Sequence, residues 1–170
     1  IYSESPYIVL DNDEEYRTFK KNIQKSAKEL CNSFDDEQVL LSLSNFENSE
    51  YYVRKDIHNI LLRSGTYKFL IDLININPNF DFDYQYQQTD IHIEIQNEAF
   101  RIMLFLTSKY TELITKEFYD LNFIDLFFDN MKYYQSSELS LCRGLNIISN
   151  LLHDLPLFYD KAEFITRRYY

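Results

Sequence analysis

The side chains best suited to proton transfer or metal binding are three histidines and two cysteines: His58, His92, His153, Cys31 and Cys142. His92 precedes Glu94 and Glu98, but this spacing differs from the HExxH and ExxH patterns that place metal ligands together on a helix. The two glutamates instead stand near the start of a predicted helix, where carboxylates interact favourably with the helix dipole. We expect His58 to be an ordinary surface or half-buried helix residue, and His153 to lie near a helix C-terminus.

The cysteines and glycines offer no further catalytic pattern. Cys31 and Cys142 are far apart and form no CxxC pair, so neither a zinc site nor a disulfide framework is predicted. Neither cysteine is flanked by a base that could activate it as a nucleophile. Gly65 and Gly144 stand alone, so the sequence has no glycine-rich phosphate loop. We therefore predict no catalytic residue, no metal site and no cofactor, and expect that the protein is not an enzyme.

Net charge limits the classes of partner. The formal net charge is −10 and the isoelectric point is near 4.7. An acidic chain is not attracted to phosphate backbones, and no polybasic patch is present for anionic lipids. We expect neither nucleic acid nor a membrane as partner. A protein or peptide partner that is steered by charge would be basic, unless the charge serves only solubility.

Two features bear on the compartment. The cysteines sit in apolar helical contexts, which is typical of free thiols in a reducing compartment. No apolar run approaches the roughly 18 residues of a membrane span, and the N-terminus lacks a signal-peptide pattern. We predict a cytoplasmic protein, with the nucleus as the alternative. Because the chain opens on Ile1, we expect that the initiator methionine was removed, and a fragment of a longer solenoid is one interpretation.

The distribution of chain breakers favours an all-α fold. With 170 residues, 2 glycines and 3 prolines, the chain suits one domain but lacks the turns that a β-sandwich or barrel needs. Residues 1–36 are predicted to form an N-terminal arm followed by a capping helix over 13–33, with Asp11 or Asp13 as its cap. The acidic stretch 35–37 is interpreted as a break before the next helix.

Residues 37–154 are predicted to hold most of the remaining helices, and 155–170 the start of a further one. Residues 75–90 are expected to be a loop, although 81–86 alternate as a strand would. The first predicted helix of this region runs through Val39 and Leu43, and residues 52–74 are predicted to form two short helices that meet at Gly65. Three further helices are predicted over 93–110, 113–118 and 123–131. The helix after these is predicted to be capped by Ser136 or Ser137 and to end before Pro156.

These helices contain an internal repeat. The segment Glu112–Asp154 has a short, a medium and a long helix, and its length matches the roughly 40–47 residues of one armadillo unit. GLNIISNLL at 144–152 resembles the core of the third armadillo helix. EAFRIMLFLT at 98–107 and VLLSLSNF at 39–46 fit the same template. The resemblance covers the chain from Val39 onward, and another α-solenoid, such as HEAT repeats, or a non-repeat bundle remains an alternative.

This repeat defines a register between equivalent residues. Leu43, Met103 and Ile148 correspond and are expected to be buried. In the preceding helices Gly65 corresponds to Asn122, and both residue types tolerate a positive φ. The resemblance implies a single domain over 1–170, folded as a right-handed α-solenoid of about three armadillo-like repeats. The loop 75–90 would be an insertion between a second and a third helix.

The resemblance also implies a function. Armadillo proteins that grip extended peptides line their concave face with third helices carrying Trp and Asn ladders. In this register the Trp positions hold Leu41, Arg101 and Asn146, while the Asn positions hold Asn45, Phe105 and Asn150. We therefore expect a non-enzymatic protein–protein interaction scaffold that binds its partner through these six residues. A nuclear-transport-like adaptor for basic peptides is the alternative, although the Trp ladder is missing. An enzyme built on a helical scaffold is the third hypothesis.

Overall fold

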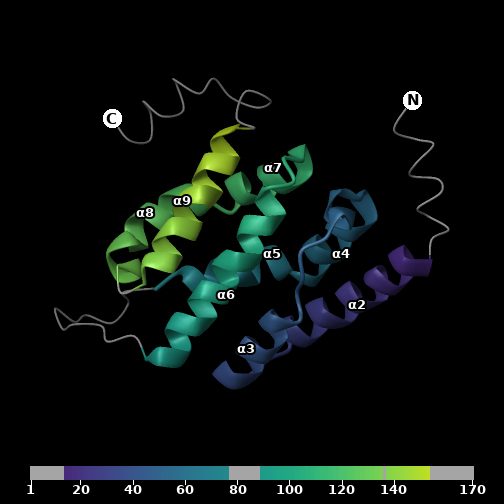
Figure 1. Ribbon diagram of the computed structural model, residues 1–170, viewed down its shortest axis with the longest axis horizontal. Helices are drawn as coiled ribbons and strands as arrows, with labels where there is room; N and C mark the ends of the chain where they lie inside the picture. The colour runs from purple at the N-terminus through teal and green to yellow at the C-terminus, as the bar shows by residue number, and fades with distance from the viewer. Residues whose placement is uncertain (1–13, 77–88, 136, 154–170) are drawn as a thin grey trace.

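Every regular element that the computed structural model describes is helical (Figure 1). The model describes residues 14–76, 89–135 and 137–153, and no strand occurs within these ranges. The predicted all-α class is therefore confirmed for this part of the chain. The elements are α2 (Glu14–Cys31), α3 (Asp36–Ser44), the short 3-10 helix η1 (Glu50–Val53), α4 (Lys55–Ser64), α5 (Thr66–Ile74), α6 (Asp90–Thr107), α7 (Glu112–Asp120), α8 (Phe123–Tyr134) and α9 (Glu138–His153).

Two rows of helices make up most of the molecule. In the first row, α6 packs against α3 on one side and against α9 on the other (Figure 1). In the second row, α5 contacts both α2 and α8. The rows are joined because α2 packs on α3, α5 on α6, and α8 on α9. The helix α2, which was predicted to be a terminal cap, thus lies in the second row next to α5 and also packs on α3 of the first row.

Side-chain caps define where several of these helices begin. Asp35 accepts a 2.8 Å hydrogen bond from the backbone N–H of Gln38, so the acidic stretch 35–37 starts α3. Asp35 lies in the predicted break between α2 and α3, but Asp36 and Glu37 already belong to α3, because acidic side chains at a helix start favour the dipole. Ser137 caps α9 by accepting a bond from the N–H of Ser140 at 3.3 Å, as one of the two predicted serines.

The turns within the helix pairs α4–α5 and α7–α8 have the same backbone geometry. Gly65 separates α4 from α5 with φ of +80°, and Asn122 separates α7 from α8 with φ of +61°. Both residues thus adopt the positive φ that their residue types were predicted to tolerate. Glycine adopts this region without penalty, and asparagine tolerates it better than most residues. Each turn reverses the chain sharply enough for two short helices to follow each other directly.

The core contains the three residues that were predicted to be buried. Leu43 and Met103 are fully buried, and Ile148 is 7% exposed, which confirms their expected burial. Aromatic rings fill much of the space between the rows. The ring centroids of Phe100 and Tyr134 lie 5.2 Å apart in an edge-to-face arrangement. The Tyr134 hydroxyl also donates to the carbonyl of Ile74, which ties the end of α8 to the end of α5.

Some sequence predictions differ from the structure or lie outside the described residues. The helix predicted over 93–110 begins earlier, at Asp90, because Thr89 accepts a bond from the N–H of His92 at 3.4 Å. The 3-10 helix η1 was not predicted. The predictions outside the described residues concern the arm with its caps, most of the 75–90 loop including 81–86, Ser136, the stop at Pro156 and the further helix in 155–170.

Candidate partner-binding face

The six predicted contact residues differ widely in exposure. We name the solvent-facing side of α3, α6 and α9 the third-helix face. Leu41 on α3 is 67% exposed, which is unusual for a leucine, and Asn45 and Asn146 are exposed as well. Arg101 and Asn150 are half-buried. Phe105 is only 7% exposed, so the structure removes its ring from the accessible surface.

Phe105 is covered by the unpredicted helix η1. Its ring stacks on that of Tyr52, with centroids 5.2 Å apart and an interplanar angle of 30°. The Tyr52 hydroxyl donates to the carbonyl of Glu47 at 3.0 Å, which holds the ring in place. Phe105 therefore supports the segment between α3 and α4 instead of offering apolar area to a partner. This contact could not be predicted from the sequence, because Tyr52 belongs to a segment far from Phe105 along the chain.

Arg101 connects α6 to α3. Its Nη2 donates to the carbonyl of Leu43 at 3.2 Å, and its Nε donates to Glu98 at 3.1 Å. The Leu43 carbonyl lies in the last turn of α3 and also accepts a 3.1 Å bond from the backbone N–H of Phe46, so Arg101 adds another donor there. The guanidinium carbon also lies 5.8 Å from the centroid of the Phe105 ring. Arg101 is thus held by several contacts and remains partly open to solvent.

Asn150 makes hydrogen bonds within the molecule. Its Nδ2 donates to Thr107 at 3.2 Å, and its Oδ1 accepts from the Tyr110 hydroxyl at 3.3 Å. Tyr110 has a positive φ of 53°, and its ring contacts that of His153 in a tilted arrangement, with ring centroids 4.4 Å apart. These hydrogen bonds of the Asn150 amide join α9 to the end of α6. Among the six predicted residues, Asn150 and Phe105 therefore have structural contacts that compete with partner binding.

Asn45 lies beside a hollow of about 360 Å³ between α2 and the segment that follows α3. Phe19 and Ile23 supply apolar surface there, while Lys25 and Glu29 supply charge. Asn45 is the C-terminal cap of α3, and its backbone N–H bonds to the end of that helix. The side chain is therefore available at one end of the third-helix face, next to α2.

A polar cluster between α6 and α9 was missed from the sequence. The side-chain oxygen of Asn97 accepts from the hydroxyls of Ser137, at 3.0 Å, and Ser140. The Asn97 carbonyl accepts from Nη1 of Arg143 at 2.7 Å. One signal was present, because the predicted register aligns Gln38, Glu98 and Arg143, and all three residue types are polar.

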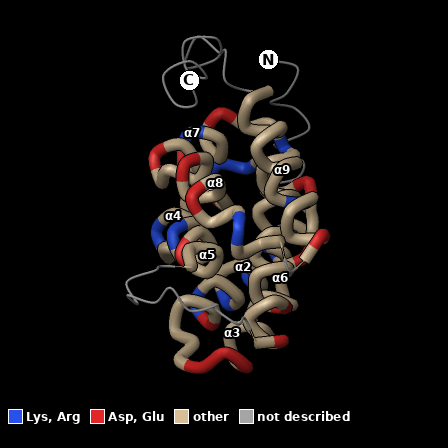
Figure 2. Tube along the Cα trace, turned by 90° about the vertical axis from the view of Figure 1, so that its left-hand side faces the viewer, with Lys and Arg blue, Asp and Glu red and all other residues tan. Residues whose placement is uncertain are grey.

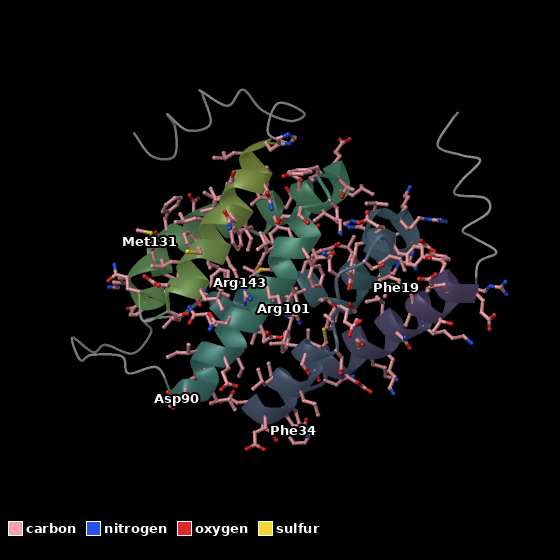
Figure 3. All side chains as sticks on the ribbon, in the orientation of Figure 1. Phe19, Phe34, Asp90, Arg101, Met131 and Arg143 are labelled. Atoms are coloured by element: carbon pink, nitrogen blue, oxygen red, sulfur yellow. The ribbon has the colours of Figure 1, made fainter. Side chains whose placement is uncertain are left out.

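Arg101 and Arg143 share a single carboxylate. Glu98 lies 3.0 Å from Nη2 of Arg101, and it also interacts electrostatically with Arg143. Partial burial lowers the pKa of Arg143, the positive charge of Arg101 lowers it further, and Glu98 opposes both effects. Two guanidinium groups thus stand close to each other in an acidic protein. Figure 3 labels both side chains near the centre of the molecule, on the neighbouring helices α6 and α9.

Acidic side chains stand at the other end of this face. The first turns of α3, α6 and α9 contain Asp36 and Glu37, Asp90, and Glu138 respectively. Figure 2 shows this most clearly at the end of the molecule near α3. Carboxylates at helix N-termini are stabilised by the helix dipole, so these charges need no ligand to explain them.

The histidines have contacts of their own. The Nε2 atom of His92 lies 3.0 Å from Asp36 and links α6 to α3. His58 is buried and bonds to the Tyr67 hydroxyl through Nδ1 at 2.8 Å, so its expected surface or half-buried position was wrong.

Within the described ranges, no group of three or more His, Cys, Asp or Glu side chains is placed to hold a metal ion. Among the same residues, no helix combines the length and apolar character needed to span a membrane.

No protein-family model, curated protein or solved structure matches this chain. Its class therefore follows from its own helices, and the described residues define an all-α protein.

Proposed function

We propose that the chain is an armadillo-like, right-handed α-solenoid that works as a non-enzymatic scaffold by binding a protein partner along the third-helix face. The observation that carries this proposal is the row α3–α6–α9. These three helices were predicted as equivalent from the sequence, and they pack side by side in chain order. Repeats that share a core with their neighbours produce such a row.

Two further observations support the repeat. The helices α2, α5 and α8, each preceding a third helix, also contact one another in chain order. The pairs α4–α5 and α7–α8 are each divided by a residue with positive φ, Gly65 and Asn122. In this arrangement α2 and α3 are the second and third helices of an incomplete first unit. A bundle without repeats would not be expected to produce matching turns at matching positions.

The accessible part of the third-helix face suits a peptide chain. Leu41 offers exposed apolar area, and Asn146 offers an amide that both donates and accepts hydrogen bonds. Arg101 adds a partly exposed guanidinium between them in the order of helices. We therefore propose Leu41, Asn45, Arg101 and Asn146 as contact residues, with Phe105 and Asn150 supporting the face from within.

Selection from a random peptide-display library on the intact chain tests this proposal. Peptides that bind should weaken about tenfold when Leu41→Glu is introduced, because a charge replaces exposed apolar area, and several-fold when Asn146→Ala is introduced, because its amide is lost. Leu62→Glu is the matched control, because Leu62 is 43% exposed on α4, outside the row. Binding that ignores both face variants, or that Leu62→Glu weakens equally, would overturn the proposed face.

The same selection tests the alternative of an adaptor for basic peptides. An adaptor would enrich Lys- and Arg-rich sequences, whereas a scaffold with other partners would not. Circular dichroism of each variant should confirm unchanged helicity, since all three substitutions are at exposed positions.

A further inference from the structure

The arginine pair on the third-helix face has a geometry suited to an anionic group. Arg101 and Arg143 come from the adjacent helices α6 and α9, and each donates to a backbone carbonyl of the preceding helix in the row. These bonds hold the guanidinium groups in place before any partner arrives. A pre-positioned arginine loses less conformational freedom when it binds a ligand than a free one does.

The charges around this pair are unequal. Glu98 is within ion-pair distance of Arg101 and also interacts with Arg143, so one carboxylate faces two guanidinium groups. Among the described residues, Arg143 makes a single hydrogen bond, to Asn97, which leaves several of its N–H groups available. Because both side chains are half-buried, their mutual repulsion is screened less than it would be in bulk water.

We propose that Arg101 and Arg143 receive a carboxylate side chain from an acidic segment of the protein partner that lies along the third-helix face. This inference rests on the proposed function and adds the charge of the partner to it. It reverses the expectation drawn from the net charge of −10, which favoured a basic partner. Net charge sums the whole surface, whereas recognition depends on the groups that meet at the interface.

A carboxylate fits this position for a specific reason. The planar guanidinium group of Arg143, which among the described residues is bonded only through Nη1, can bind a carboxylate through two parallel N–H···O bonds, and such bonds are stronger where water is partly excluded. Nε and Nη2 of Arg101 already contact Glu98, so Arg101 adds mainly its positive charge. A Lys or Arg side chain at the same place would meet two like charges. An acidic segment is therefore favoured here and a basic segment is disfavoured.

Fluorescence anisotropy with two labelled peptides of equal length tests the proposal. One peptide alternates Glu with Gly and Ser, and the other carries Lys in place of Glu. The intact chain should bind the Glu peptide more tightly, and added salt should weaken this binding. Arg143→Gln should weaken it about tenfold, because charge-assisted hydrogen bonds are lost. Arg143→Lys should weaken it less, because the charge remains but the two-pronged geometry does not.

Lys68→Gln is the matched control for a lost positive charge. Lys68 lies on α5, its side chain is 69% exposed, and it pairs with Asp72. Its substitution should leave binding of the Glu peptide unchanged. Thermal melts of all variants should accompany the titrations. If Arg143→Gln does not fold, the affinities of the two peptides for the unaltered chain and for Arg143→Lys test the carboxylate assignment instead.

The outcomes separate this inference from the proposed function. Tighter binding of the Lys peptide, or equal binding of the Glu peptide by Arg143→Gln, would overturn the carboxylate assignment. If library peptides depend on Leu41 and Asn146 but are basic, the binding face stands and the carboxylate assignment falls. If no peptide depends on those two residues, the proposed function itself falls.

Discussion

The units α4–α5–α6 and α7–α8–α9 place different residues at equivalent positions and still pack alike. In the proposed register, Leu70 corresponds to Phe127, and Ala99 corresponds to Gly144. Leu70, Ala99 and Phe127 are fully buried, and Gly144 is buried as well. A Cβ atom placed on Gly144 would lie 2.0 Å from the Phe127 ring. The later unit thus has a larger residue on its second helix and a smaller one on its third.

This difference teaches that, in the proposed register, a larger residue on one helix is matched by a smaller residue on the helix packed against it. Interiors are close-packed, so a larger side chain on one helix requires a smaller one opposite. The polar contacts diverge in the same way. Arg101 joins α6 to α3, whereas Arg143, at a different repeat position, joins α9 to α6.

The largest expected effect is the loss of a core side chain at the repeated position. Ile148→Ala should lower the free energy of unfolding by about 2 to 5 kcal/mol. Met103→Ala should cost at least as much, because α6 is packed between α3 and α9 and Met103 is fully buried. Urea denaturation followed by circular dichroism measures both. An Ile148→Ala protein as stable as the unaltered chain would show that the register is wrong.

The second prediction concerns the compensating pair. Gly144→Ala should destabilise the protein by about 1 to 3 kcal/mol, although alanine is the better helix former, because its Cβ meets the Phe127 ring. The double variant Gly144→Ala with Phe127→Leu recreates the Leu70 and Ala99 pair of the earlier unit. It should be more stable than Gly144→Ala alone. A double-mutant cycle that shows simple additivity would argue against the equivalence of the two units.

The third prediction concerns the turns. Asn122→Gly should change the free energy of unfolding by less than about 0.5 kcal/mol, because glycine occupies the equivalent turn at Gly65. Asn122→Ala should cost about 1 to 2 kcal/mol, because a Cβ without a polar group disfavours the left-handed region. Thermal unfolding distinguishes these values. Equal stability of the two variants would mean that the turn at 122 can relax to a negative φ.

The smallest expected effect is the pH dependence contributed by His58 in the earlier unit. Burial lowers the pKa of His58, so the folded protein keeps it neutral where the unfolded chain, with a pKa of about 6.5, binds a proton. Stability should therefore fall as pH drops below about 6.5, because the unfolded state then binds more protons. Its counterpart in the register, Thr115, has no such titration.

The variant His58→Gln provides the check. The part of the acid dependence that comes from His58 should disappear in this variant between pH 7 and the lowered pKa, whatever its overall melting temperature. The difference between the two proteins, measured by thermal melts in matched buffers, isolates this contribution. An unchanged pH profile would show that other groups account for the acid dependence.

Local patterns in the sequence were sufficient for most helices and for the turns. The spacing of apolar residues depends on neighbours three or four positions away, so it predicts a helix without knowledge of the rest of the chain. The residue types at Gly65 and Asn122 likewise report a local backbone requirement. For the same reason Leu43, Met103 and Ile148 were correctly predicted as buried.

The composition of the third-helix face depended on contacts between distant segments. Phe105 is buried because Tyr52 of η1 lies over it, and Asn150 is engaged because Thr107 and Tyr110 reach it. Arg143 became a candidate only when α9 packed on α6. Helical periodicity states which side of a helix is apolar, but it does not state which segment will cover that side. Only packing of the whole chain decides which polar side chains remain for a partner.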